Sequence, residues 1–224
     1  MGRVLLFGWV LSVPALAWGQ SSIDEFELGG SATPVSPECI RLTPDTPYVS
    51  GSAWYRAPVD LSRPFEMKLK IVLGEKDGSG ADGIVFVFHP VMQTGWRGEG
   101  MGFAGLVPSL GIEFDTYQNL HLNDVPADHL ALMQNGESFH GEGTWAPRPL
   151  ANLEDGKRHP LSLRWDPNSG LSITLDGALQ ARYPPAVVRL TFGDISTVYW
   201  GMTAGTGRLS NNQDVCIERV FLGV

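Results

Sequence analysis

The stretch at residues 111–119, Gly-Ile-Glu-Phe-Asp-Thr-Tyr-Gln-Asn, constrains the fold more than any other part of the chain. In an extended strand Glu113 and Asp115 share one face, whereas Ile112 and Phe114 point to the opposite face. The apolar face needs a core beneath it, so the segment predicts a strand of a packed sheet. Like charges on neighbouring positions of a sheet destabilise it by up to about 1 kcal/mol, so the two carboxylates require a compensating partner.

Further side chains that can bind metals follow within one loop length. Carboxylate and amide oxygens suit calcium, and an imidazole suits a transition metal. A Glu-x-Asp pair alone is more typical of a solvated acidic strand edge, which is the alternative interpretation. Within seventeen residues, however, the segment offers six potential ligands: Glu113, Asp115, Tyr117, Asn119, Asp124 and His129. This density predicts a metal site.

The spacing of these six residues resembles the metal segment of the legume (L-type) lectins and is similar to that of concanavalin A at every position. The resemblance implies Ca²⁺ and a second divalent ion of the Mn²⁺ type. It assigns the second ion to Glu113, Asp115, Asp124 and His129. It assigns calcium to Asp115, Asp124, the Asn119 side chain and the backbone carbonyl of Tyr117.

The resemblance extends over nearly all of the chain that follows the first nineteen residues. Segments 26–32, 51–58, 81–83, 102–106 and 201–212 are similar, in this order, to motifs of the same family, most closely to its bacterial members. The family fold implied is all-β, an antiparallel β-sandwich of the concanavalin A-like jelly-roll type. The implied function is carbohydrate binding without catalysis.

A saccharide offers neutral hydroxyls that both donate and accept, so its binder needs an ionised acceptor, amide donors and an apolar platform. The matched positions are Asp82, Gly102, Tyr117, Asn119, Arg208 and Leu209. The resemblance implies that Asp82 accepts from sugar hydroxyls, after a cis Ala81–Asp82 peptide, and that Gly102 donates its backbone N–H. Asn119 would bind calcium through its oxygen and the sugar through its amide group. Taken alone, Asp82 and Gly102 are typical of ordinary turns.

Other polar and aromatic residues show no such pattern. We interpret four histidines as surface or loop residues: His89, His121, His140 and His159. We interpret four tryptophans as packing residues rather than sugar platforms: Trp54, Trp145, Trp165 and Trp200.

A glycoside hydrolase on the same sandwich is the alternative function. Laminarinase-type glycosidases carry Glu-x-Asp-x-x-Glu on a strand, and the two glutamates act as nucleophile and acid/base. Here the last position is Gln118. An amide cannot donate and recover a proton, so the sequence predicts no enzyme of this type.

The chain begins like an exported protein. Arg3 precedes a short apolar run at 4–13, and the small residues of 17–19 form a cleavage pattern. We therefore expect a signal peptide at 1–19, a single L-type lectin domain at 20–224, and secretion to the extracellular space or periplasm. A membrane anchor is the alternative, but the run is shorter than the about 20 residues needed to span.

Charge and cysteine content agree with an exported glycan binder. A net charge of −8 argues against nucleic acid and anionic membranes as partners. We expect a glycan or glycoconjugate as ligand, no membrane insertion, and a candidate homo-oligomer, because lectins often gain avidity by pairing.

Cys39 and Cys216 are the only cysteines, and an even count in an exported chain predicts a disulfide. Two unpaired buried thiols are the alternative.

Strand signals cover the whole chain. Residues 65–73 alternate apolar and polar, and 84–88 are continuously apolar, which indicates a strand covered on both faces. Asp176-Gly177 between two alternating runs predicts a tight hairpin. We expect two more strands at 187–192 and 198–204, and no window shows a sustained helical period. The predicted architecture is two packed antiparallel sheets.

Overall fold

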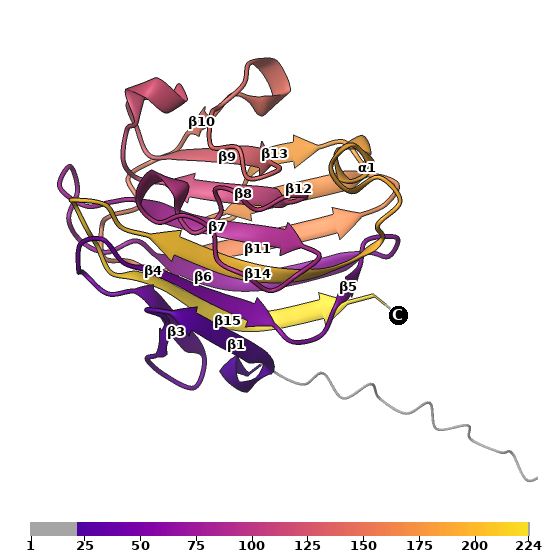
Figure 1. Cartoon of the computed structure of the whole chain (residues 1–224), viewed down its shortest axis with the longest axis horizontal. Helices are drawn as coiled ribbons and strands as arrows, with labels where there is room; N and C mark the ends of the chain where they lie inside the picture. The colour runs from indigo at the N-terminus through magenta and orange to yellow at the C-terminus, as the bar shows by residue number, and fades with distance from the viewer. Residues whose placement is uncertain (1–21, 224) are drawn as a thin grey trace, which may run out of the picture.

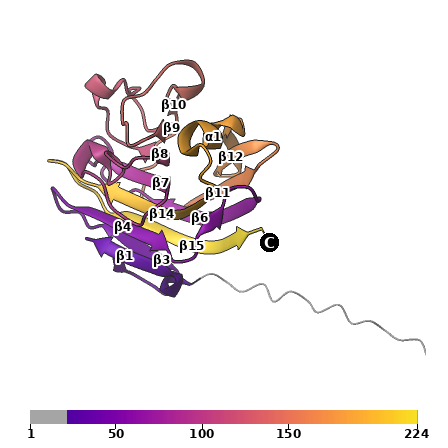
Figure 2. The same cartoon turned by 45° about the vertical axis from the view of Figure 1, so that its right-hand side comes forward.

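The computed structural model describes residues 22–223, and two antiparallel sheets lie face to face in it (Figures 1 and 2). This confirms the predicted all-β sandwich. The expected signal peptide lies outside the described residues. Between residues 22 and 223, no helix has the length and apolar character needed to cross a membrane.

The first sheet has the strand order β1-β4-β14-β7-β8-β9-β10, and β5 pairs with β14 at its side. Its strands are β1 (Phe26–Gly30), β4 (Ser50–Tyr55), β5 (Val59–Asp60), β7 (Gly83–His89), β8 (Leu110–Asp115), β9 (His129–Gln134), β10 (Arg148–Pro149) and β14 (Thr197–Gly205).

The second sheet has the order β13-β12-β11-β6-β15-β3-β2. Its strands are β2 (Thr33–Pro34), β3 (Cys39–Thr43), β6 (Phe65–Val72), β11 (His159–Asp166), β12 (Gly170–Leu175), β13 (Ala178–Tyr183) and β15 (Gln213–Leu222). Outside the strands, residues 22–223 contain four 3₁₀ turns and one short α-helix: η1 (Ile23–Glu25), which precedes β1, η2 (Gly98–Gly100), η3 (Leu120–Leu122), η4 (Gly143–Trp145) and α1 (Ala186–Phe192).

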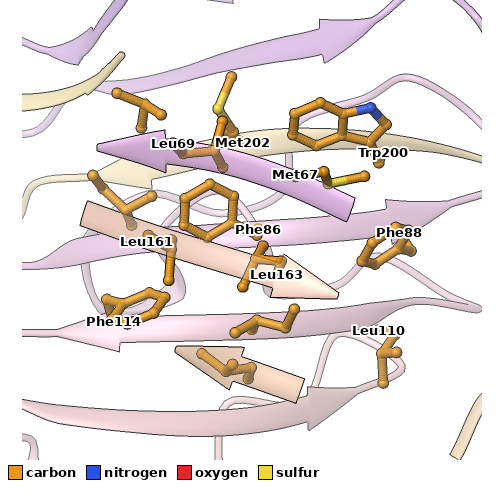
Figure 3. Close-up of a cluster of buried hydrophobic side chains, with 14 of the residues drawn as sticks. Met67, Leu69, Phe86, Phe88, Leu110, Phe114, Leu161, Leu163, Trp200 and Met202 are labelled. Atoms are coloured by element: carbon orange, nitrogen blue, oxygen red, sulfur yellow. The ribbon is translucent and has the colours of Figure 1, made fainter. Parts of the chain in front are cut away.

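The main core fills the space between the sheets. Phe86, Phe114 and Trp200 of the first sheet point toward Met67 and Leu163 of the second (Figure 3). All five side chains are fully buried. Each such burial stabilises the fold by about 1.5–3 kcal/mol.

A second apolar cluster lies on the outer face of the first sheet. Val85 and Val87 of β7 pack there with Met101 and Phe103, which come from the long connection between β7 and β8. The connection therefore folds over the sheet and covers it. This explains why β7 is apolar at successive positions, as the sequence predicts for a strand buried on both faces.

The segment predicted as a strand at 187–192 is instead the helix α1, so this prediction is wrong. Its β-branched residues favour a strand locally, but the helical period places Val187, Thr191 and Phe192 on one buried face. The Thr191 hydroxyl donates to the carbonyl of Val187, one turn earlier. Leu190 lies on the other face and is 72% exposed. Tertiary burial outweighs the local propensity here.

Two further sequence predictions are confirmed. Cys39 and Cys216 form a disulfide between directly opposed residues of β3 and β15. The predicted packing tryptophans also agree: Trp54, Trp165 and Trp200 are at least 97% buried, and Trp145 stacks on Tyr183.

The hairpin predicted at Asp176-Gly177 joins β12 to β13, and both turn residues have positive φ, 51° and 77°. A Cβ added at Gly177 would meet no atom within 4 Å, so only the backbone conformation opposes a side chain there. We expect Gly177→Ala to lower the free energy of unfolding by about 1–2 kcal/mol in urea titrations. Gly177→Asn should lose clearly less, because asparagine tolerates this conformation. Equal stability of the alanine variant and the unmodified chain would contradict the argument.

Candidate metal and ligand site

The site forms where four neighbouring strands of the first sheet end side by side. The pairing register places Gly205 of β14, Gly83 of β7, Asp115 of β8 and His129 of β9 in one row across the sheet. Loops that are far apart in sequence therefore leave the sheet at the same end. They bring the segments 80–82, 116–128 and 206–209 together.

The acidic face of β8 is buried rather than solvated. Glu113 and Asp115 are 1% and 2% exposed, while Ile112 and Phe114 lie in the core on the opposite face, as predicted. The strand ends at Asp115 and does not continue to Asn119. Burial, and next to it the charge of Glu113, raises the pKa of Asp115 well above its usual range. An uncompensated pair of buried acids is costly, so a cation fits here.

The first group of ligand atoms contains the oxygens that suit calcium. Asp115, Asp124 and His129 each offer an atom within 4.8 Å of the others, and we call the two carboxylates the calcium-type group. The loop that follows β8 wraps around these acids, because Asp115 accepts from the backbone N–H of Tyr117 and Asp124 accepts from that of Asn119. Among the described residues, Asn119 Oδ1 is a buried oxygen without a hydrogen-bond partner. Carboxylate and amide oxygens are the donors that calcium prefers.

A second group lies beside the first and consists of Glu113, His129 and His140. Glu113 Oε2 is buried and accepts no hydrogen bond within the described chain. The His129 Nδ1 atom lies 3.1 Å from the carbonyl oxygen of Ala127. That contact favours a proton on Nδ1 and leaves Nε2 free to bind a metal, which is the usual arrangement of metal-binding histidines.

His140 lies in a loop, in agreement with the surface-or-loop interpretation, but its side chain is only 3% exposed and therefore not on the surface. Its Nε2 atom lies 3.1 Å from both Glu113 Oε2 and Asp124 Oδ1. Burial lowers the pKa of His140, but Asp124 and Glu113 outweigh it and raise the pKa to about 9. The sequence carried one weak signal, a histidine eleven positions after His129.

Two other histidines also differ from the surface interpretation. His89 is 3% exposed and contacts the backbone carbonyl of Val91 through Nδ1. His159 is 7% exposed and lies between Asp155 and Asp176. His121 is exposed, as predicted.

A hollow of about 450 Å³ opens next to the calcium-type group. Its lining comprises Tyr48, Ala81, Asp82, Arg97, Gly98, Glu99, Tyr117, Asn119, Thr206, Gly207, Arg208 and Leu209. The structure thus brings together five of the six positions predicted to bind a saccharide. Tyr48, Arg97 and Glu99 were not predicted, because they come from loops without a local motif.

Gly102 is the sixth predicted position, and the structure does not bring it to the hollow. Its backbone N–H donates to the carbonyl of Trp96 at 2.7 Å, inside the loop itself. Gly98, from the same connection, lines the hollow instead. The glycine-rich stretch offers several glycines of similar local sequence, and only the folded loop decides which one faces the ligand.

Asp82 lines the hollow and follows a cis Ala81–Asp82 peptide, as the resemblance implied. Two backbone hydrogen bonds fix the main chain of Asp82: its N–H donates to the carbonyl of Gly205, and its carbonyl accepts from the N–H of Thr116. The side chain is 4% exposed, and Oδ2 has no hydrogen-bond partner in the described chain. Burial and the charge of Glu99 raise the pKa of Asp82 to about 7.

Asn119 connects the two parts of the site. Its backbone N–H donates to Asp124 of the calcium-type group, and its Oδ1 is buried without a partner in the described chain. Its Nδ2 donates to Glu99 Oε2 at 3.1 Å, on the lining of the hollow. An ion on the oxygen side would therefore orient the amide donor on the ligand side.

The two-sheet sandwich, its buried ligand atoms and the adjoining hollow define a lectin-type domain. A profile of the family described as "Legume lectin beta-barrel domain" matches residues 19–219. The chain belongs to this legume (L-type) lectin family, whose domains bind carbohydrates and are not enzymes. The glycosidase alternative also lacks its second carboxylate, because Gln118 is an exposed amide.

Individual relatives agree with this assignment. The L-type lectin-domain containing receptor kinase VII.1 of Arabidopsis thaliana is 26% identical over 226 residues, covering 87% of this chain and 32% of the kinase. The chain thus spans about a third of the length of that relative.

Solved structures show the same fold. A lectin from Bauhinia forficata in complex with GalNAc has a TM-score of 0.75 at 17% identity, covering 91% of this chain and 94% of that one. The Ca²⁺/Man-bound exoplasmic/lumenal domain of VIP36 has a TM-score of 0.68 at 22% identity, covering 88% and 83%.

Proposed function

We propose that this protein is a secreted lectin that binds a saccharide in the hollow beside Asp82, through a site ordered by calcium and a second divalent ion. The observation that carries the proposal is the arrangement of Asn119. Its Oδ1 is buried without a hydrogen-bond partner in the described chain, its backbone N–H donates to Asp124, and its Nδ2 donates to Glu99 on the lining of the hollow. Metal binding and ligand recognition would share this side chain.

The residues of the hollow suit neutral hydroxyl groups. Asp82 supplies a carboxyl acceptor whose Oδ2 has no partner in the described chain. A calcium ion bound nearby would favour its charged form, and hydrogen bonds to a charged group are the stronger ones. Tyr117 and Tyr48 supply aromatic surface, and Arg208 and Leu209 supply backbone groups of the last loop. Gly98 takes the place expected for Gly102, because it allows a close approach of the ligand to the backbone.

Calcium would be held by Asp115, Asp124, Asn119 and the backbone of Tyr117, and the second ion by the carboxylates and imidazole of Glu113, Asp115, Asp124 and His129. The bound ions supply positive charge that compensates the buried acids. Two structurally similar proteins support binding of calcium and a saccharide. The VIP36 domain is described in a Ca²⁺/Man-bound form, and the Bauhinia forficata lectin in complex with GalNAc. The apolar N-terminal run supports secretion.

A glycan array with and without chelator tests the proposal. We expect binding in calcium, loss after chelator treatment and recovery when calcium and the second ion are restored. Ion binding at a hundredfold excess over its Kd stabilises the folded state by about 2.7 kcal/mol. For a chain of this size that corresponds to a rise in Tm of roughly 5–10 °C, measured by thermal unfolding of the stripped and reloaded protein. The two-ion site would be refuted if neither glycan binding nor the Tm changed on addition of chelator or calcium.

A further inference from the structure

We propose that His140 is a direct ligand of the second ion. Together with Glu113, Asp124 and His129 it completes a closed set of two imidazoles and two carboxylates, which selects a zinc-type ion over manganese. The inference rests on the two-ion site proposed above and adds a residue outside the six positions that the sequence predicts.

The two imidazole nitrogens lie close to each other and to both carboxylate oxygens. His140 Nε2 lies 3.1 Å from Glu113 Oε2 and 3.1 Å from Asp124 Oδ1. His129 Nε2 lies 3.9 Å and 3.8 Å from the same two oxygens. The two Nε2 atoms are 3.4 Å apart.

These separations match a four-coordinate metal site. Donors at the corners of a tetrahedron, each about 2.0–2.1 Å from zinc, lie about 3.3–3.4 Å from one another. The five separations scatter around that value, between 3.1 and 3.9 Å. Small side-chain rotations would equalise them.

The chemistry of the group requires a cation between its members. Glu113 Oε2 and Asp124 Oδ1 are buried and have no hydrogen-bond partner within residues 22–223. A single proton on His140 Nε2 cannot point at both oxygens, and the His129 Nε2 atom faces it as well. A divalent ion in the middle satisfies all four atoms and balances the two carboxylate charges.

The surrounding chain holds both imidazoles in position. The Nδ1 atom of His129 contacts the Ala127 carbonyl, which fixes its tautomer. The His140 backbone is bound to η3 on both sides, because its N–H donates to Leu122 and its carbonyl accepts from the Asn123 side chain. Asp124 directly follows these residues, so the two hydrogen bonds tie the loop of His140 to the loop of Asp124.

The donor set sets the metal preference. Two imidazole nitrogens with two carboxylates suit Zn²⁺ or Co²⁺, whereas Mn²⁺ and Ca²⁺ favour sites made mainly of oxygens. Calcium would remain with Asp115, Asn119 and the second oxygen of Asp124. The competing explanation is that a protonated His140 itself neutralises the two acids and takes the place of the ion.

Cobalt titration of the full chain tests the proposal, with the protein first stripped by chelator and then saturated with calcium. We expect one Co²⁺ per chain, with the intense visible absorption of four-coordinate cobalt, and displacement of Co²⁺ by Zn²⁺ in preference to Mn²⁺. His140→Ala should weaken Co²⁺ binding by at least about 100-fold and remove the intense bands, since loss of even an outer partner costs 10–100-fold. Calcium binding, measured separately by calorimetry, should remain and also shows that the variant is folded.

His121→Ala is the matched control, because His121 is exposed on the neighbouring turn, and it should bind Co²⁺ like the unmodified chain. X-ray absorption at the zinc edge of the unmodified, loaded protein adds a measurement without any mutation and should count two imidazoles. Unchanged cobalt affinity in His140→Ala, a single imidazole, or tighter binding after removal of His140 would each overturn the proposal. If calcium and glycan binding were intact in those cases, the proposed lectin function would still hold. If the unmodified chain bound no ion at all, both the proposal for His140 and the proposed two-ion site would be refuted.

Discussion

Asp124→Ala should abolish the binding of both ions and, with them, the binding of saccharide. Asp124 is 8% exposed and belongs to the group of Asp115 and His129, and its Oδ1 atom also lies 3.1 Å from His140 Nε2 of the second group. One of its oxygens accepts from the Asn119 backbone, and the other has no hydrogen-bond partner in the described chain. Without Asp124 the ions are no longer held, so the buried carboxylates of Glu113 and Asp115 lose the positive charge that would compensate them. The loop that positions Asn119 also loses its hydrogen bond to Asp124. We expect sugar affinity to fall at least about 100-fold, or about 2.7 kcal/mol.

Elemental analysis and calorimetry with the preferred glycan check this result together. Asp194→Ala is the matched control, because it removes an exposed acid from the loop after α1, far from the ligand groups in the chain. It should keep both ions and full sugar affinity. An Asp124→Ala protein that retained two ions per chain would show that the buried oxygens serve another purpose, and the two-ion site would have to be abandoned.

The fold was largely predictable because its patterns are local. Alternation around Ile112 and Phe114 predicts which face of β8 lies in the core, and the positive φ needed at Asp176-Gly177 predicts the hairpin. The main error, α1, is also instructive. A segment of seven residues with β-branched side chains offers no clear period, and its helix is stabilised by burial of Val187 and Phe192 against the rest of the molecule.

The candidate site was predictable only where its residues share one segment. The acids and His129 lie within seventeen positions of one another, so spacing reveals them. His140 comes from the next loop, and its burial follows from hydrogen bonds to Leu122 and Asn123 that no spacing rule contains. The choice of Gly98 over Gly102 depends in the same way on how the connection between β7 and β8 folds over the outer face of the sheet.

Asp82→Asn should separate saccharide binding from metal binding. Asp82 lines the hollow but is not a member of either group of ligand atoms. The substitution keeps the size of the side chain, removes its charge and replaces one acceptor oxygen with a donor. Hydrogen bonds to a charged group contribute about 1.5–3 kcal/mol each, so the loss of two should weaken sugar binding by roughly 100-fold or more. Asp115→Asn, by contrast, should lose metal and sugar together, because Asp115 is buried within the calcium-type group.

The measurement is calorimetry with the preferred glycan, with metal content determined on the same samples. Asp77→Asn is the matched control, since it removes the same charge from an exposed position of the loop that leads to Asp82. It should bind sugar normally. If Asp82→Asn lost calcium as well, its backbone contacts to Gly205 and Thr116 would be transmitting the change to the loop after β8, and the metal analysis would reveal this. Full sugar affinity with full metal content would remove Asp82 from the site, although its Oδ2 is the buried carboxylate oxygen without a partner on the described lining of the hollow.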